Sequence, residues 1–224
     1  AALIILLFAM GNNTQGYRVV GQYITGQTYV KFEPGPYFKG FGQSWTWPDE
    51  ITYDYDKLEN EEETTLEQAG IEVRYKDGGE GTIYGITRFT LPNTEEEMLK
   101  IQRKYRSKEG LANKLFRAHV NSVMQNTAGL MDSDESYAER RGQFDAMAKA
   151  QVRNGNLVIV TKEVVKFEDG KEYCGLVDKS SAKELKYECS KVKRTRVLEP
   201  FPKMVDGKYA YAENDLKEYG IEVP

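Results

Sequence analysis

Residues 85–97 read Gly-Ile-Thr-Arg-Phe-Thr-Leu-Pro-Asn-Thr-Glu-Glu-Glu, and the periodicity of the chain changes within this stretch. Up to Thr90 the β-branched and aromatic residues predict a strand. From Thr94 the spacing is helical, because Thr94 and Glu97 form the pattern of a capping box and Met98, Ile101 and Tyr105 mark one helical face. This switch from a strand-rich to a helical region decides the fold class.

The region before the switch, residues 16–92, reads as strands separated by turns. Tyr17–Tyr23 and Thr28–Phe32 carry β-forming residues between glycine-containing turns. Residues 71–75 and 82–90, on either side of a Lys-Asp-Gly-Gly turn, predict a hairpin. The Trp45-Thr46-Trp47-Pro48 segment is expected to follow an irregular path.

The region after the switch predicts three helices and then more strands. Gly110 is expected to end the first helix, and the third is expected to stop at Asn154-Gly155, a typical C-cap. Beyond it, residues 157–167 and 172–177 predict a hairpin around a turn at 168–171, and 185–197 predict a further strand. A short helix over 212–219 comes last. Strands followed by helices and then strands indicate an α+β protein.

The first ten residues, Ala1–Met10, are entirely apolar and differ from the rest of the chain. Because a membrane-spanning helix needs about 20 apolar residues, ten cover half a span. We interpret them as the remnant of a membrane anchor whose beginning lies upstream. A signal-peptide segment and a buried core element are the alternatives. The side chains expected in the membrane are Leu3, Ile4, Ile5, Leu6, Leu7 and Phe8.

Two further features could meet a membrane. Trp45 and Trp47 would share one face of a strand, which suits either a membrane interface or a protein core. The basic stretch 183–196 could face anionic lipid, or it could be a solvated strand edge that prevents aberrant pairing.

The composition excludes several classes of function. The 224 residues carry a net charge of -4, which argues against a nucleic-acid partner. With two cysteines and one histidine, His119, a Cys/His metal site is not expected, and no motif indicates a cofactor or a catalytic centre. We therefore predict a protein that is not an enzyme, although an acid–base pair among its many carboxylates stays open. Cys174 and Cys189 are expected to be cross-strand neighbours, as thiols or as a disulfide.

The order of these parts resembles the SPFH or Band 7 family, which includes stomatins, prohibitins and flotillins. Residues 16–20 with Gly26 are similar to the family's opening strand pair, and residues 33–38 to its Pro-Gly-x-x-Phe turn. Residues 85–97 resemble its strand leading into helices, and residues 216–223 resemble the entry to its second domain. The likeness covers most of the chain. The β-rich stretch at about 156–212 departs from it as an insertion, and the family's long coiled coil is missing.

The resemblance implies a domain order of an anchor remnant (1–10), a first SPFH-like domain (11–131) and a second one (132–224) that continues beyond residue 224. It also implies a membrane-anchored scaffold without catalysis, which oligomerises into a ring or cage and either organises a membrane microdomain or encloses membrane partners. Its partners would be other copies of itself, membrane lipids and a membrane client such as an AAA protease. A soluble secreted or periplasmic α/β binding module is the alternative function.

Overall fold

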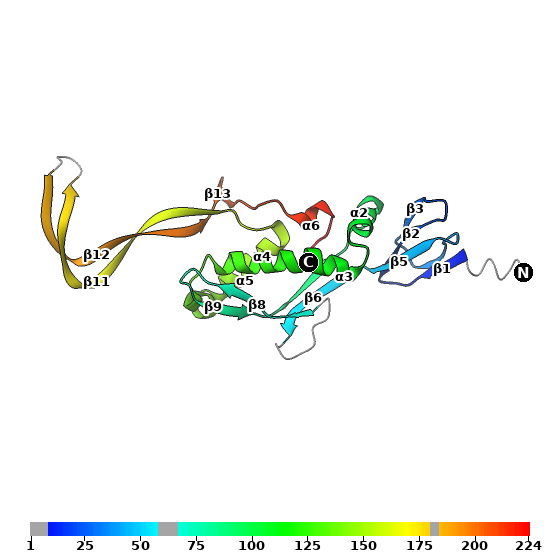
Figure 1. Ribbon diagram of the computed structural model, residues 1–224, viewed down its shortest axis with the longest axis horizontal. Coiled ribbons are helices and arrows are strands. Elements are labelled where there is room, and N and C mark those ends of the chain that lie inside the picture. The colour runs from blue at the N-terminus through cyan, green and yellow to red at the C-terminus, as the bar shows by residue number, and fades with distance from the viewer. Residues whose placement is uncertain (1–8, 58–66, 180–183) are drawn as a thin grey trace, which may run out of the picture. The chain divides into compact units, whose positions relative to one another are not determined.

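The computed structural model describes residues 9–57, 67–179 and 184–224, and side chains outside 57–68 and 165–195. Its strands and helices are segregated along the chain, so the protein is α+β (Figure 1). The chain divides into two compact units, Ala1–Leu157 with Ala210–Pro224, and Val158–Tyr209. The second unit falls within the stretch 156–212 that was expected to be a β-rich insertion.

The first unit opens with two small antiparallel sheets. One pairs β1 with β4, and in the other β2 lies between β3 and β5. The bounds are β1 Met10–Asn13, β2 Tyr17–Gln22, β3 Thr28–Lys31, β4 Gly35–Phe38 and β5 Gln43–Pro48. The prediction of an irregular path at residues 45–48 was wrong, because these residues pair in register with β2 and complete β5.

The folded body begins before Gly11, the boundary predicted from the sequence. Ala9 is buried, its carbonyl accepts a hydrogen bond from the Lys39 amide at 2.8 Å, and Met10 opens β1. The predicted anchor side chains, Leu3 to Phe8, lie outside the described residues. No helix in the described part of the chain is both long enough and apolar enough to span a membrane.

Five further strands carry the chain to the helices: β6 Glu50–Lys57, β7 Glu67–Ala69, β8 Ile71–Arg74, β9 Glu80–Ile83 and β10 Ile86–Thr90. The hairpin of β8 and β9 confirms the turn predicted between them. The second predicted strand, 82–90, is in fact two strands. It is interrupted at Tyr84 and Gly85, and β10 pairs with β6 instead. Gly85 sits against the Tyr55 ring, where a side chain would clash.

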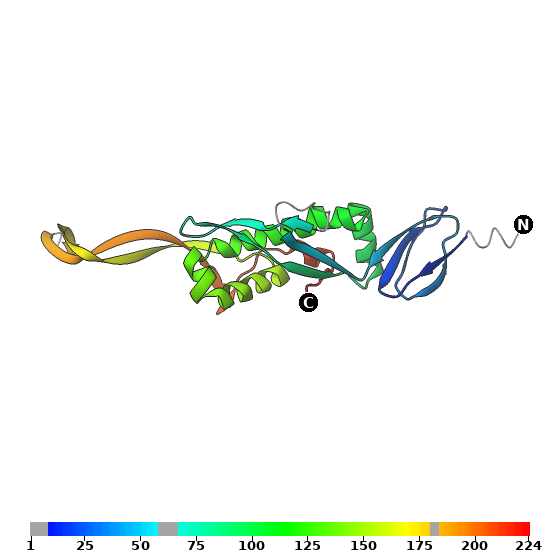
Figure 2. The same ribbon diagram turned by 90° about the horizontal axis from the view of Figure 1, so that it is seen from below.

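The helical region contains α2 Glu95–Tyr105, α3 Lys108–Leu111, a π-helical turn η1 Ala112–Phe116, α4 Arg117–Ala128, a second π turn η2 Glu135–Glu139 and α5 Arg141–Asn154. Figure 2 shows α4 and α5 side by side. Helix α5 ends at Asn154 with Gly155 at φ 106°, as predicted.

Two details of the helix boundaries differ from the sequence prediction. The first break comes at Arg106, which has a positive φ of 65°, rather than at Gly110. Gly110 lies inside α3, and a side chain there would collide with the Tyr105 carbonyl. At the start of α2, Thr94 is the N-cap residue, but its hydroxyl contacts the Glu97 carboxylate instead of a backbone amide.

One hydrophobic core joins the strands to the helices in the first unit. At its centre Phe89 of β10 stacks on Phe116 of η1, with ring centroids 3.9 Å apart and an angle of 6° between the planes. Both rings are fully buried. The short helix α6 (Asp215–Glu218) adds Leu216 to this core, and Glu222 then pairs with Thr90 at the edge of β10.

The second unit is dominated by a long antiparallel ribbon of β11 (Ile159–Lys179) and β12 (Glu184–Pro202). Pairing runs from Ile159 opposite Pro202 to Lys179 opposite Glu184. The predicted turn at 168–171 is wrong, because β11 continues through it with only a shift of register between Asp169 and Tyr173. A small hairpin, β13 (Met204–Val205) with β14 (Lys208–Tyr209), completes the unit.

Candidate functional site

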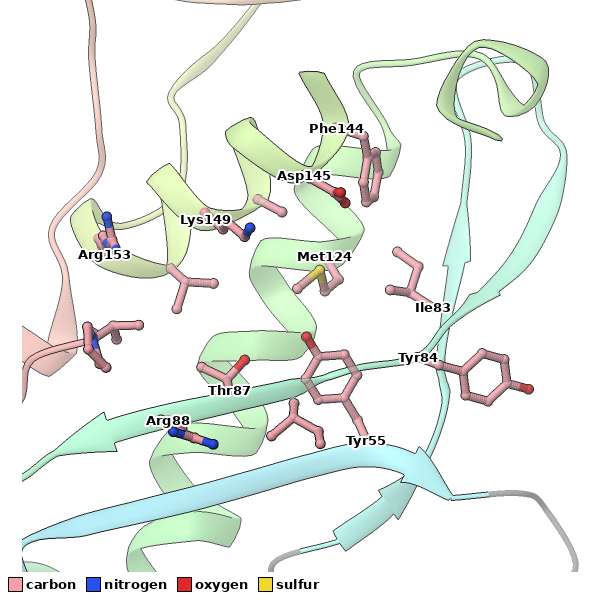
Figure 3. Close-up of a pocket in the computed structure, with 15 residues that line it drawn as sticks. Tyr55, Ile83, Tyr84, Thr87, Arg88, Met124, Phe144, Asp145, Lys149 and Arg153 are labelled. Carbon is pink, nitrogen blue, oxygen red and sulfur yellow. The ribbon is translucent and has the colours of Figure 1, made fainter. Parts of the chain in front are cut away.

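A pocket of about 580 Å³ in the first unit is the candidate functional site (Figure 3). It lies between the sheet edge formed by β6 and β10 and the helices α4 and α5, and the last residues of the chain contribute to it. Its volume is within the range of small-molecule sites, about 300–1,000 Å³. Its apolar lining comes from Ile83, Ile86, Met124, Phe144, Ala148, Val152 and Val223.

Helix α5 supplies the pocket with an apolar stripe and a charged stripe that run side by side. Phe144, Ala148 and Val152, spaced four residues apart, are buried against the core. Each of these residues is followed in the sequence by a charged one, namely Asp145, Lys149 or Arg153. These three charged side chains are exposed and line the rim of the pocket. Because residues four apart lie on one helical face, the two stripes follow from the 3.6-residue period.

The rim carries more positive than negative charge. Arg88 of β10 joins Lys149 and Arg153 of α5, while Asp145 is the acidic side chain in the lining. Among the described residues, none of these three cations has a carboxylate within ion-pair distance. Unpaired cations beside an apolar surface are able to bind an anion, and arginine binds carboxylates and phosphates in a two-pronged geometry.

Tyr55 and Thr87 place hydroxyl groups within the pocket. Tyr55 is 5% exposed, and Figure 3 shows its ring rising from β6 toward Met124. Burial raises the pKa of the Tyr55 phenol, and the nearby Asp145 and Asp54 carboxylates add to the rise, whereas a hydrogen bond with Thr87 opposes it. Tyr55 is therefore neutral at physiological pH and serves as a hydrogen-bonding group rather than as a base.

The sequence did not single out this site, since its members come from five separate segments of the chain. The one local signal is the spacing of Asp145, Lys149 and Arg153 directly beside the apolar positions of α5. Arg88 has no local signal, because its place at the pocket depends on the pairing of β10 with β6.

The two tryptophans occupy different environments. Trp47 is 1% exposed, and its indole N–H donates a hydrogen bond to Gln102 Oε1 at 2.7 Å, so the core alternative holds for Trp47. Trp45 is half-buried and lines a hollow of about 960 Å³ between the β2–β5 sheet and α2. That hollow is lined mainly by amides, hydroxyls and two arginines, Arg103 and Arg106.

His119 of α4 is half-buried, and its Nε2 lies 3.0 Å from the Val152 carbonyl oxygen. Burial lowers the pKa of His119, and the hydrogen bond to Val152 and the Asp215 carboxylate oppose that shift only in part. His119 is therefore held within the fold by its contact with the Val152 carbonyl.

Acidification should therefore destabilise the protein partly through His119. The unfolded chain takes up a proton near pH 6.5, whereas the folded chain resists protonation until a lower pH, so stability is lost as the pH falls through this window. We expect His119→Gln to lose less of its stability than the wild type between about pH 7.5 and about pH 5. Urea midpoints at both pH values measure this. Equal losses in the two proteins would show that His119 does not contribute.

The remaining predicted positions lie in the ribbon of the second unit. Cys174 is the register partner of Cys189, so the two residues are cross-strand neighbours as expected. Their side chains, and most of those in the basic stretch 183–196, are outside the described residues. Within the described part of the chain, no group of three His, Cys, Asp or Glu side chains is close enough to hold a metal ion.

Comparison with protein-family models and with curated protein sequences finds no match to this chain. The function must therefore be argued from the residues and the geometry.

Proposed function

We propose that the protein is a membrane-anchored scaffold subunit whose copies join side by side into a ring or cage, and that it is a member of the SPFH family. The ordered motifs at residues 16–38, 85–97 and 216–223 support the family assignment. The feature of the structure that supports the proposal is the β11–β12 ribbon, because in the described part of the chain the outer backbone edge of each strand has no strand partner.

The ribbon is unusual in both length and pairing. Its strands have 21 and 19 residues, against about 5–6 for an average strand, and its sheet consists of these two strands. A lone two-stranded hairpin is only marginally stable in water. In the described part of the chain each strand pairs with the other alone, which leaves an outer edge of backbone donors and acceptors on each side. Contact with neighbouring copies would satisfy both edges.

Side-by-side contact and a membrane anchor would reinforce each other. A contact between two different surfaces of one chain closes into a ring when the rotation between copies permits. One short apolar anchor binds a bilayer weakly, but many anchors on one ring act at high effective concentration. The side chains proposed for this anchor are Leu3 to Phe8, and the client enclosed by the ring would be a membrane protein such as an AAA protease.

Shortening the ribbon tests the proposal. Glu163 and Leu198 are register partners, so a short Asn-Gly turn between them can replace residues 164–197 while keeping the base of the ribbon. In detergent we expect the full chain to sediment as a large uniform particle. The shortened chain should fall to a few subunits at most, because its lateral contact is gone.

The control is the thermal unfolding of the first unit, whose hydrophobic core lies outside the deleted residues and should melt at the same temperature. Equal particle mass for both chains would contradict the role of the ribbon. Monomers or dimers of both chains would favour the alternative, a soluble binding module.

A further inference from the structure

We propose that the pocket between β10 and α5 binds a small amphiphile, an alkyl chain that ends in a carboxylate or a phosphate. This proposal does not rest on assembly or on the membrane anchor. It assigns a ligand class to a site inside one subunit.

The interior of the pocket fits an alkyl chain. Phe144, Ala148 and Val152 of α5 form one wall. Met124 of α4 and Ile83, the last residue of β9, contribute further apolar surface. All of these side chains except Ile83 are buried, and Ile83 is partly buried against the core. The pocket is therefore formed by packed core residues. An alkyl chain placed here would bury apolar surface, which favours binding.

The rim of the pocket fits one anionic head group. Arg88, Lys149 and Arg153 come from two different elements and all line the same opening. This concentration of positive charge is local, because the chain as a whole carries a net charge of -4. Charge-assisted hydrogen bonds from guanidinium and ammonium groups would hold the head, and these three cations outnumber Asp145, the acidic side chain of the lining.

Two hydroxyl groups, those of Tyr55 and Thr87, also line the pocket. Tyr55 is buried and neutral, and it shares a hydrogen bond with Thr87. A carboxylate or phosphate oxygen can accept hydrogen bonds from these hydroxyls as well as from the cations. An apolar lining that also carries hydroxyl groups and cations provides partners for both parts of a fatty acid or an alkyl phosphate.

Calorimetric titration of the full chain with decanoate, kept below its micellar concentration, tests the proposal. We expect one molecule to bind per subunit. Decanol, which lacks the charge, should bind at least about tenfold more weakly, and inorganic phosphate, which lacks the chain, should show no measurable binding. Decyl phosphate and vesicles of phosphatidylglycerol identify which source of the head group is preferred.

Variants of the lining locate the site. Lys149→Gln and Arg153→Gln should each weaken decanoate binding by about tenfold, whereas Arg141→Gln, an exposed change on the same helix outside the pocket, should leave it unchanged. Ala148→Phe should abolish binding by filling the pocket. Because that change is in the core, Ala148→Leu and the thermal unfolding of each variant are measured in parallel.

Several results would overturn the proposal. They are the absence of decanoate binding to the wild type, equal binding of decanol, equal binding of inorganic phosphate, and unchanged affinity in the Lys149 and Arg153 variants.

Discussion

Phe116→Ala is expected to lower the free energy of unfolding by about 3–5 kcal/mol, the largest effect of any single substitution considered for this protein. The Phe116 ring stacks on Phe89 at 3.9 Å, and neither ring is exposed. The substitution removes the stack and leaves a cavity where the helical layer meets β10. Urea unfolding followed by circular dichroism measures the loss.

Tyr137→Ala is the matched control, because Tyr137 is an aromatic residue in the same helical region but is 84% exposed. It should change the stability by less than about 0.5 kcal/mol. A loss below about 1 kcal/mol for Phe116→Ala would show that the stack does not hold the two layers together.

Arg18→Met is expected to cost about 2–4 kcal/mol. Arg18 is 3% exposed, and its guanidinium donates hydrogen bonds to the carbonyls of Leu91 and Pro92 and to Asp49, with Nε 3.0 Å from Asp49 Oδ1. Methionine keeps much of the apolar stem but leaves both carbonyls without their donor. The β2 strand would then lose its tie to the segment that leads from β10 into α2.

Arg18→Lys should recover only part of this loss, since an ammonium group does not reproduce the planar fork of donors. The control is Lys31→Met in the neighbouring strand β3. Lys31 pairs with Glu33 at 2.7 Å, but this pair is exposed and screened by solvent, so its loss should change the stability far less than the loss of Arg18. Equal effects of the Arg18 and Lys31 substitutions would contradict the role assigned to Arg18.

The sequence predicted the features of the fold that depend on short-range chemistry. The start of α2 after Thr94, the end of α5 at Gly155 and the turn between β8 and β9 are all found where local residues indicate them. The end of α5 and the β8–β9 turn depend on only a few neighbouring residues. The start of α2 is also where the local pattern indicates it, although the Thr94 hydroxyl contacts the Glu97 carboxylate and not a backbone amide.

The failures fall into two kinds. At the first helix break the backbone is unusual, because Arg106 adopts a positive φ although it is not glycine, and Gly110 lies inside α3, where the Tyr105 carbonyl leaves no room for a side chain. Elsewhere, contacts between distant residues override local preference. In the ribbon, pairing on both sides of residues 168–171 carries β11 through a segment whose composition favours a turn. The pocket was missed for the same reason, because Arg88 and Lys149 meet only after the sheet and helices pack.

Negative-stain electron microscopy of detergent-extracted particles of the full chain tests the proposed side-by-side assembly most directly. We predict uniform rings or domes formed by many copies of the chain. A field of small single particles with the mass of one or two chains would contradict the proposal.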